Sequence, residues 1–372
     1  MCYYPRKFVV LLIAGGSGGH VFPAIAFAQR LVDMSYPVYF LTDQRGARFI
    51  QEYSYLFEHV EVIPNVASAW RGMAYVKLFV AAIEMYLSLR KTRKFFQQYS
   101  VQAIFSFGGF MTVMPMIWAR LWRTYGKKRV KFFALHQSDR VLGRANRFLS
   151  RWIPVVFTGY PDTLGFLKKV HPIVVGTPVR KTFFQIPPMK LPETTLGILI
   201  LGGSQGASFW SSLILNALAQ LSLQHRSRLH VFHQCPEQEL SIVKKNYGEL
   251  SIVCEVRPFF SSLPEVLAQV HVVFSRCGAS TAAELACCGR SGFFVPYPHA
   301  KDHHQSHNAE FWVSQNAGWS CHQRMLKEEK ITLFLQECLE DPKRLLYTGA
   351  HAMRLGRKDA AVAMINYWKG CV

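Results

Sequence analysis

Residues 8–20 read FVVLLIAGGSGGH, and residues 196–207 read LGILILGGSQGA. In both segments an apolar run typical of a buried strand leads into a glycine turn and then into a helical stretch. Strand-like and helical stretches alternate through the rest of the chain, which is typical of parallel sheets covered by helices. The repeated unit predicts an α/β protein with two Rossmann-like domains.

The boundary between the two domains is predicted from a loss of periodicity. VGTPVR at 175–180 is followed by Pro187, Pro188 and Pro192, which interrupt any regular element. The expected divisions are a first domain over 1–178, a linker over 179–193 and a second domain over 194–351, with a cleft between the domains. Residues 359–369 are predicted to form a helix with Met364, Ile365 and Trp368 on one side.

Composition narrows the class of protein. The nine cysteines include no CxxC pair, which is typical of reduced thiols in a cytoplasm. Residues 1–180 hold 24 Lys+Arg against 8 Asp+Glu and so carry +16 of the net charge of +20. Such a basic half is typical of proteins that bind nucleic acid, anionic lipid or a phosphorylated substrate. Residues 8–29 are uncharged, but four glycines and Pro23 interrupt them, so no transmembrane span is predicted.

The glycine turns suit a phosphate ligand, because backbone amides and the positive end of the following helix come close to it. Neither turn has the Gly-Lys-Ser/Thr ending of a P-loop. A dinucleotide fingerprint fits poorly, since Val21 occupies the third glycine position. Asp43, at the end of the second predicted strand, lies where a ribose-binding carboxylate would be and supports an oxidoreductase as the alternative.

A third strand-to-helix unit begins at Val272 and continues through SRCGASTAAE at 275–284. Ser280 or Thr281 is expected to cap the helix, and the free amides there suit a diphosphate. Glu284, one turn later, has two interpretations: a carboxylate that binds both ribose hydroxyls, or a carboxylate favoured by the helix dipole.

The segment HAKDHHQSHN at 299–308 is rich in hydrogen-bonding groups and suits a sugar. His303 and His307 are spaced i, i+4 and leave zinc binding as an alternative, although neither HExxH nor a thiolate partner accompanies them. The chain contains no Asp-x-Asp motif, so a metal-held nucleotide diphosphate is not indicated.

Taken together, the motifs resemble one family: the N-acetylglucosaminyltransferases of peptidoglycan synthesis, glycosyltransferase family 28. The matching motifs occur in the family's order: GGSGGH at 15–20, GGF at 108–110, VGTPVR at 175–180, GGSQGA at 202–207, and SRCGAS at 275–280 followed by Glu284. The resemblance extends from Val9 to about Gly318. It implies the GT-B fold, in which the acceptor lipid binds mainly to the N-terminal half and the sugar nucleotide mainly to the C-terminal half. It also implies that a C-terminal helix, about 352–372, returns to the first domain.

The resemblance implies a hexosyltransferase that moves N-acetylglucosamine from UDP-N-acetylglucosamine to lipid I, undecaprenyl-pyrophosphoryl-MurNAc-pentapeptide. A related transferase with another acceptor is the nearest alternative. Among the donor-binding residues that it implies, Phe260 contacts uracil, Glu284 the ribose and Arg180 the region near the donor. The other implied donor-binding residues are Ser17, Gly18, Gly19, Asp139, Ser204, Gln205, Arg276, Ala279, Ser280, Thr281, His304 and Gln305. The implied acceptor-binding residues are Gly108, Gly109, Phe110 and His136.

Several positions depart from the family pattern. Ser17 stands for Thr, Phe110 for Tyr and Cys277 for Ser, which preserves size. The family's His-Glu-Gln-Asn stretch is His136-Gln137-Ser138-Asp139 here, and its Gln-Gln pair is His304-Gln305. Asp139 therefore introduces a carboxylate where an amide is usual.

The implied reaction inverts the anomeric carbon and requires a base. His20 is the first candidate, because its ordinary pKa is near neutral and the glycine turn would expose it. Asp139 is the second candidate. Amides of the loops and of the helix starting near Ala279 are expected to stabilise the departing diphosphate, so no metal or other cofactor is expected.

Residues 75–96 predict a membrane-surface helix, because apolar side chains recur at helical spacing among basic ones. A helix packed on the domain core has the same pattern. A nearby basic cluster with two tryptophans favours anionic lipid over nucleic acid, for which no motif is present. The expected membrane residues are Phe79, Ile83, Tyr86, Arg90, Lys91, Trp118 and Trp122. The expected location is the cytoplasmic face of the plasma membrane.

Overall fold

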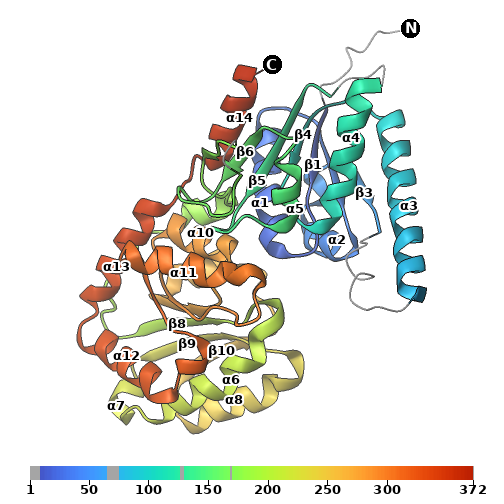
Figure 1. Ribbon diagram of the computed structural model, residues 1–372. Helices are drawn as coiled ribbons and strands as arrows, with labels where there is room; N and C mark the ends of the chain where they lie inside the picture. Colours follow the sequence, from blue (N-terminus) through green and yellow to red (C-terminus); the bar gives the residue numbers. More distant parts are fainter. Residues whose placement is uncertain (1–8, 65–74, 126–129, 168–169, 372) are drawn as a thin grey trace. The chain divides into compact units, whose positions relative to one another are not determined.

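The computed structural model describes residues 9–64, 75–125, 130–167 and 170–371 (Figure 1). The chain forms two compact units. Unit 1 comprises Met1–Lys181 and Arg357–Val372, and unit 2 comprises Thr182–Gly356. The C-terminal segment therefore belongs to the same unit as the N-terminal half.

Unit 1 is built on a seven-stranded parallel sheet in the order β3-β2-β1-β4-β5-β6-β7. The strands are β1 (Val9–Ile13), β2 (Val38–Thr42), β3 (His59–Val62), β4 (Val101–Ser106), β5 (Phe132–Gln137), β6 (Val155–Thr158) and β7 (Ile173–Val174). All five residues of β1 are buried, because helices cover the sheet on both faces. This central strand places the first glycine turn in the middle of the sheet's carboxyl edge.

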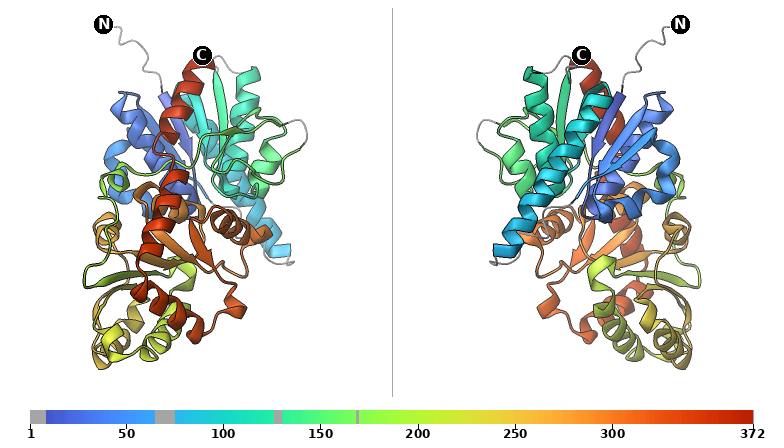
Figure 2. Two further views of the ribbon diagram at one scale, coloured as in Figure 1. Left: turned by 90° about the vertical axis from the view of Figure 1, so that its left-hand side faces the viewer. Right: turned by 90° about the vertical axis from the view of Figure 1, so that its right-hand side faces the viewer.

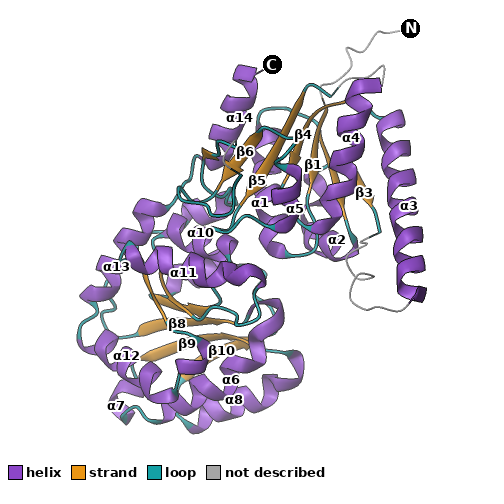
Figure 3. Ribbon diagram, viewed as in Figure 1, coloured by secondary structure: helices purple, strands orange, loops and turns teal. Residues whose placement is uncertain are grey.

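The helices of unit 1 lie on both faces of its sheet (Figure 3). They are α1 (Gly18–Asp33), α2 (Gln44–Ile50), α3 (Tyr75–Gln98), α4 (Val113–Tyr125), α5 (Arg144–Leu149) and α14 (Ala360–Cys371), with short 3-10 turns η1 (Gln51–Leu56) and η3 (Phe110–Thr112). One hydrophobic cluster joins the sheet to α1 and α14, and a second joins its other face to α3 and α4.

Unit 2 repeats the plan with a six-stranded parallel sheet in the order β10-β9-β8-β11-β12-β13. Its strands are β8 (Leu196–Leu201), β9 (Leu229–Gln234), β10 (Val253–Arg257), β11 (Val272–Ser275), β12 (Ser291–Phe294) and β13 (Gly318–Ser320). Its α-helices are α6 (Gly203–Ala219), α7 (Leu223–Arg226), α8 (Leu240–Glu249), α9 (Leu263–Gln269), α10 (Ala279–Cys288), α11 (His304–Ser314), α12 (Glu328–Glu340) and α13 (Lys343–Leu355). Its 3-10 turns are η4 (Lys181–Gln185), whose first residue ends unit 1, η5 (Glu237–Glu239), η6 (Lys301–His303) and η7 (Gln323–Met325). The two parallel sheets confirm the predicted fold class.

The chain passes from unit 1 to unit 2 after Lys181, inside the segment expected as a linker. Lys181 is ion-paired with Asp33 at the end of α1, within unit 1. In unit 2 the buried Arg290 donates to the carbonyl oxygens of Leu267, Cys288 and Pro187 at 2.8, 2.8 and 3.1 Å. Most of the expected linker is therefore fastened to unit 2.

The return to unit 1 begins at Arg357, five residues later than the expected position of about 352. The reason is that α13 packs closely on α10 within unit 2. A Cβ atom at Gly349 would lie 2.6 Å from the carbonyl oxygen of Gly289, which shows how tightly the two helices meet.

Helix α14 is at the red end of the ribbon in Figure 2, and aromatic contacts fasten it to the rest of unit 1. Trp368 is buried, with its ring 5.2 Å from that of Tyr36 and 5.8 Å from that of Phe105, centre to centre. Met364 and Ile365 belong to the same cluster. Aromatic pairs of this kind stabilise a core beyond the area that they bury.

Trp368→Ala should lower the free energy of unfolding by about 3–5 kcal/mol, because it leaves a cavity between α14 and the sheet. Asn366, two residues earlier, is exposed, so Asn366→Ala should stay within about 0.5 kcal/mol of the parent. Urea denaturation followed by circular dichroism measures both. Equal losses in the two variants would contradict the docking of α14.

Candidate active site

The first glycine turn joins β1 to α1, and a carboxylate fastens it. Asp43 follows β2, is fully buried, and accepts a hydrogen bond from the amide of Gly16 at 3.1 Å. The same oxygen, Oδ1, accepts from the amide of Gly46 at 2.8 Å and so caps α2. Asp43 therefore lies at the end of the second strand, as the sequence predicts, and its Oδ1 holds two backbone segments together.

His20 is the third residue of α1 and is partly buried. Its Nδ1 lies 3.1 Å from the carbonyl oxygen of Gly15 and 3.3 Å from the hydroxyl of Ser17. A carbonyl oxygen can only accept, so Nδ1 carries the proton in this bond. In the neutral ring Nε2 is then the basic nitrogen, which is the tautomer that a general base requires.

Gly108 and Gly109, which follow β4, make room for this arrangement. Both have left-handed backbone angles, with φ of +97° and +91°. A Cβ at Gly108 would lie 3.0 Å from Cδ2 of His20, and a Cβ at Gly109 would lie 2.6 Å from the oxygen of Gly15. Phe110, next in the motif, has an exposed side chain at the start of η3.

The end of β5 holds the other candidates of unit 1. His136 is buried, with Nε2 3.0 Å from the oxygen of Gly176 and Nδ1 3.3 Å from the hydroxyl of Ser138. Burial lowers the pKa of His136 to about 4, so the ring is neutral at neutral pH. Both of its nitrogens are engaged within the protein, so this side chain supports the loop from inside. Asp139, two residues after the strand, is partly exposed.

The loop that carries Asp139 is organised by two residues that sequence reasoning missed. Gln137 donates from Nε2 to the carbonyl oxygens of Asp139 at 3.2 Å and Val141 at 2.9 Å. Its Oε1 accepts from Nδ2 of Asn146 at 3.0 Å. Asn146 lies on α5, and only the tertiary fold reveals this network.

Arg180 is held inside unit 1. Its Nη1 donates to the hydroxyl of Tyr53 at 2.9 Å, and its guanidinium carbon lies 4.4 Å from the ring centre of Phe22. The side chain is partly buried, and the stacking on Phe22 sets its orientation.

In unit 2, helix α10 follows β11 and carries the segment expected to hold the diphosphate. Its N-cap is Gly278, without a side-chain cap, so the expectation that Ser280 or Thr281 caps the helix is wrong. Both lie inside the first turn, after Ala279, and are partly exposed. Glu284 is the sixth residue of α10 and is nearly buried. It is too far along the helix to cap its first turn.

The loops after β11 and β12 are joined by side chains. Arg276 donates from Nη1 to the carbonyl oxygen of Val295 at 3.0 Å, and its guanidinium carbon lies 4.8 and 5.5 Å from the ring centres of Phe209 and Tyr297. Burial lowers the pKa of Arg276. The buried Asn308 donates to the oxygen of Cys277 at 3.0 Å. Asn308 belongs to the segment expected to bind the sugar, but its bond to the carbonyl of Cys277 is not predicted from the sequence.

The segment expected to bind the sugar lies at the start of α11. Oε1 of Gln305 accepts from the amide of Tyr297 at 2.9 Å, and His304 is partly exposed. His303 has φ of +50° and precedes the helix, so it does not share a helical face with His307, whose Nδ1 is 3.1 Å from Glu310. Among the described residues no group of three His, Cys, Asp or Glu could hold a metal ion.

Phe260 and its neighbour differ in exposure. Phe260 is 5% exposed, with its ring 6.4 Å from that of Phe232, whereas Phe259 is 57% exposed. Contact with a base at this position would therefore use the backbone of Phe260. The side chains of Ser204 and Gln205, in the first turn of α6, lie outside the described residues.

The expected membrane residues lie on α3 and α4. Ile83 and Tyr86 are 43% and 62% exposed, and Arg90 is exposed as well. Lys91 is exposed but donates to the oxygen of Val62 at 2.9 Å. Trp118 is partly buried, and the side chains of Phe79 and Trp122 lie outside the described residues. No helix in the described part of the chain is long and apolar enough to cross a membrane.

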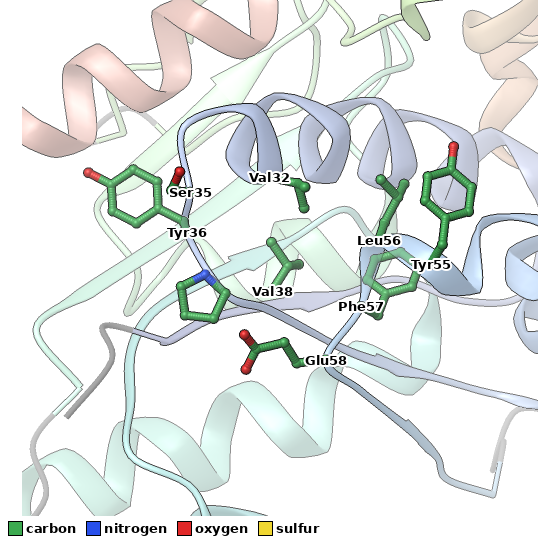
Figure 4. A pocket seen from close by; sticks show the side chains of 9 residues that line it. Val32, Ser35, Tyr36, Val38, Tyr55, Leu56, Phe57 and Glu58 are labelled. Atoms are coloured by element: carbon green, nitrogen blue, oxygen red, sulfur yellow. The ribbon is translucent and has the colours of Figure 1, made fainter. Parts of the chain in front are cut away.

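A separate pocket of about 460 Å³ lies in unit 1 (Figure 4). It is lined by residues from the end of α1 to the start of β2, including Tyr36 and Val38, and by Tyr55 to Glu58. Val38 begins β2, whereas Asp43 follows its end. The pocket is therefore at the amino edge of the sheet, opposite the glycine turn.

Two family models match the chain. The glycosyltransferase family 28 N-terminal domain matches residues 10–158, and the family 28 C-terminal domain matches residues 197–364. Each match includes one of the two glycine turns and most strands of its sheet, although β7 lies beyond the first match.

Curated relatives match along nearly the whole chain. A protein of Paramagnetospirillum magneticum is 33% identical, over 99% of this chain and 98% of its own length. One of Rhizobium etli is 31% identical, over 95% and 93%. Both are named UDP-N-acetylglucosamine--N-acetylmuramyl-(pentapeptide) pyrophosphoryl-undecaprenol N-acetylglucosamine transferase.

Solved structures of glycosyltransferases are similar to the chain over nearly its whole length. The crystal structure of Acinetobacter baumannii MurG has a TM-score of 0.74 at 25% identity and covers 97% of this chain and 99% of its own. The calicheamicin glycosyltransferase CalG4 has a TM-score of 0.62 at 15% identity, over 98% and 99%, and shares the fold. The chain belongs to glycosyltransferase family 28, which confirms the family that its motifs predict.

Proposed function

We propose that this protein transfers N-acetylglucosamine from UDP-N-acetylglucosamine to the C4 hydroxyl of N-acetylmuramic acid in lipid I, which gives lipid II for peptidoglycan. The observation that carries this proposal is the full-length match to relatives named for that transfer. A radiolabelled UDP-N-acetylglucosamine assay with lipid I as acceptor tests it. Label transferred to a different lipid, with none on lipid I, would contradict the acceptor.

His20 is the proposed general base. Nε2 takes the proton of the C4 hydroxyl while that oxygen bonds to the anomeric carbon. The bond between that carbon and the diphosphate oxygen breaks, so UDP leaves and the configuration inverts. The bond from Nδ1 to Gly15 supports this role, because it keeps Nε2 as the basic nitrogen.

Unit 2 is proposed to hold the donor. The first amides of α10 and the partial positive charge of its N-terminus would stabilise the negative charge on the leaving diphosphate. Glu284 and Gln305 would bind the ribose and the sugar. Asn308 supports this site by fixing the carbonyl of Cys277, just before α10 begins.

His20→Ala should lower kcat by at least about 100-fold, within the range typical of general bases. His171→Ala is the matched control, because His171 is an exposed histidine of the same unit. The assay is lipid II formation at saturating donor. A loss below about tenfold would reassign the base, and the same assay on Asp139→Asn would then test the second candidate.

Removal of divalent cations should leave the rate unchanged, because the amides of α10 take the place of a metal at the diphosphate. The measurement is lipid II formation with EDTA and with added Mg²⁺. A rate that falls with EDTA and returns with Mg²⁺ would contradict the metal-free mechanism.

The acceptor is a lipid, so we propose peripheral association with the anionic cytoplasmic face of the plasma membrane through α3. The exposed Ile83 and Tyr86 would insert among the lipids, and the exposed Arg90 would pair with anionic headgroups. The charge of +16 in residues 1–180 supports the same orientation.

Ile83→Asp should reduce binding to anionic liposomes several-fold, because it places a carboxylate in the inserting face. Leu223→Asp is the matched control, since Leu223 is 64% exposed on α7 of unit 2. Sedimentation with liposomes of increasing anionic lipid content measures both. Binding that is indifferent to lipid charge, or equal losses in both variants, would contradict the assignment of this surface.

A further inference from the structure

A single peptide group lies between Asp43 and His20. The carbonyl of Gly15 and the amide of Gly16 belong to the same peptide unit. Its N–H donates to Oδ1 of Asp43 at 3.1 Å, and its oxygen lies 3.1 Å from Nδ1 of His20. The buried carboxylate and the proposed base are therefore joined through one polarisable group.

We propose that Asp43 is a positioning residue of the transfer reaction, and that its carboxylate acts on the His20 imidazole through the Gly15–Gly16 peptide. This inference rests on the proposed role of His20 as the base. Asp43 is 23 positions from His20 in the sequence and follows a different strand, and we infer that it helps to set the basicity of His20.

The peptide is held in one orientation by its surroundings. Gly16 has φ of +83°, which places the turn in the left-handed region. A Cβ at Gly109 would lie 2.6 Å from the oxygen of Gly15, and a Cβ at Gly15 would lie 2.7 Å from Cγ of Met111 and 3.2 Å from Cγ of Asp43. These distances show that neighbouring loops pack closely around the peptide, and its rotation would break both hydrogen bonds.

Asp43 is itself fixed, because the same oxygen also accepts from Gly46 on α2. A carboxylate that accepts a peptide N–H draws electron density toward the peptide oxygen. That oxygen then becomes a stronger acceptor for Nδ1–H of His20. The effect is largest on the imidazolium that forms when Nε2 takes the proton. Asp43 therefore stabilises the charged ring through the peptide, as an aspartate that is hydrogen-bonded directly to a histidine does in other active sites.

Two described groups near His20 are uncharged at neutral pH and do not supply this effect. His136, at the end of β5, acts electrostatically with His20, but its low pKa of about 4 leaves it neutral at neutral pH. The Ser17 hydroxyl, 3.3 Å from Nδ1, carries no charge. Asp43, in contrast, is a carboxylate that is linked to the ring through the two hydrogen bonds of the Gly15–Gly16 peptide.

Asp43→Asn tests the proposal, because it removes the charge while an amide oxygen can still accept from Gly16 and Gly46. Without the carboxylate the imidazolium is less stable, so the pKa of His20 should fall. The acidic limb of the kcat/KM profile should move to lower pH by about half a unit to one unit, and kcat should fall about tenfold because the base is weaker. KM for UDP-N-acetylglucosamine should stay within about twofold.

Asp33→Asn is the matched control, since Asp33 is a partly exposed carboxylate at the end of α1 in the same unit. It should keep the parent profile. Asp43→Ser is the second variant, because serine retains a cap for α2 and should shift the profile in the same direction. In the His20→Ala background, Asp43→Asn should change the residual rate by less than about twofold, since the peptide no longer leads to a base.

An NMR titration of the His20 ring in the free protein separates this inference from the proposed function. A lower pKa of His20 in Asp43→Asn or Asp43→Ser supports the inference even if lipid I is not the acceptor. A folded variant in which His20 titrates as in the parent would overturn it, whether or not lipid II is formed. Additive losses in the double variant would overturn it as well.

Discussion

When helices cover both faces of a parallel sheet, polar groups can be placed only at the ends of its strands. In unit 1 the strand order β2-β1-β4-β5 places four strand ends side by side, although they are far apart in the sequence. The loops after β2, β1 and β4 contribute Asp43, the first glycine turn, and Gly108 with Gly109, and His136 lies near the end of β5 itself. Their contacts follow from the sheet order, because adjacent parallel strands end at the same edge. Small residues are required there, since the backbone of one loop packs directly on that of the next.

Unit 2 uses the same plan with different chemistry. Its neighbouring strands β8, β11 and β12 bring together the second glycine turn, the start of α10 and the loop before α11. Amides and a guanidinium fasten this edge: Asn308 holds the carbonyl of Cys277, Gln305 holds the amide of Tyr297, and Arg276 donates to the oxygen of Val295. The corresponding edge of unit 1 is fastened by a carboxylate. A carboxylate suits a loop that must support a positive imidazolium, whereas a diphosphate would be repelled by one.

Sequence reasoning predicted the elements whose signals are local. The strand predicted over 196–201 matches β8, and each glycine turn lies between a strand and a helix. Features that depend on distant residues were not predictable. Asp43 accepts from an amide 27 residues earlier in the chain, and Asn308 donates to a carbonyl 31 residues away. Both contacts form only when the sheet brings the loops together. The N-cap of α10 was misassigned for a local reason, since hydroxyl residues are common caps and Gly278 precedes them.

The departure from the family pattern at Gln137 has a physical explanation in the same edge. Its Nε2 donates to two carbonyl oxygens, those of Asp139 and Val141, and a glutamate at this position would place a carboxylate against both. Its Oε1 accepts from the backbone N–H of Gly143 at 3.0 Å and from Nδ2 of Asn146. These two donors determine the orientation of the Gln137 side-chain amide. The amide therefore satisfies donors and acceptors that a carboxylate could not. The loop that Gln137 holds carries Asp139, so the carboxylate at 139 lies two residues beyond the strand, partly exposed, on a loop whose backbone this amide fixes.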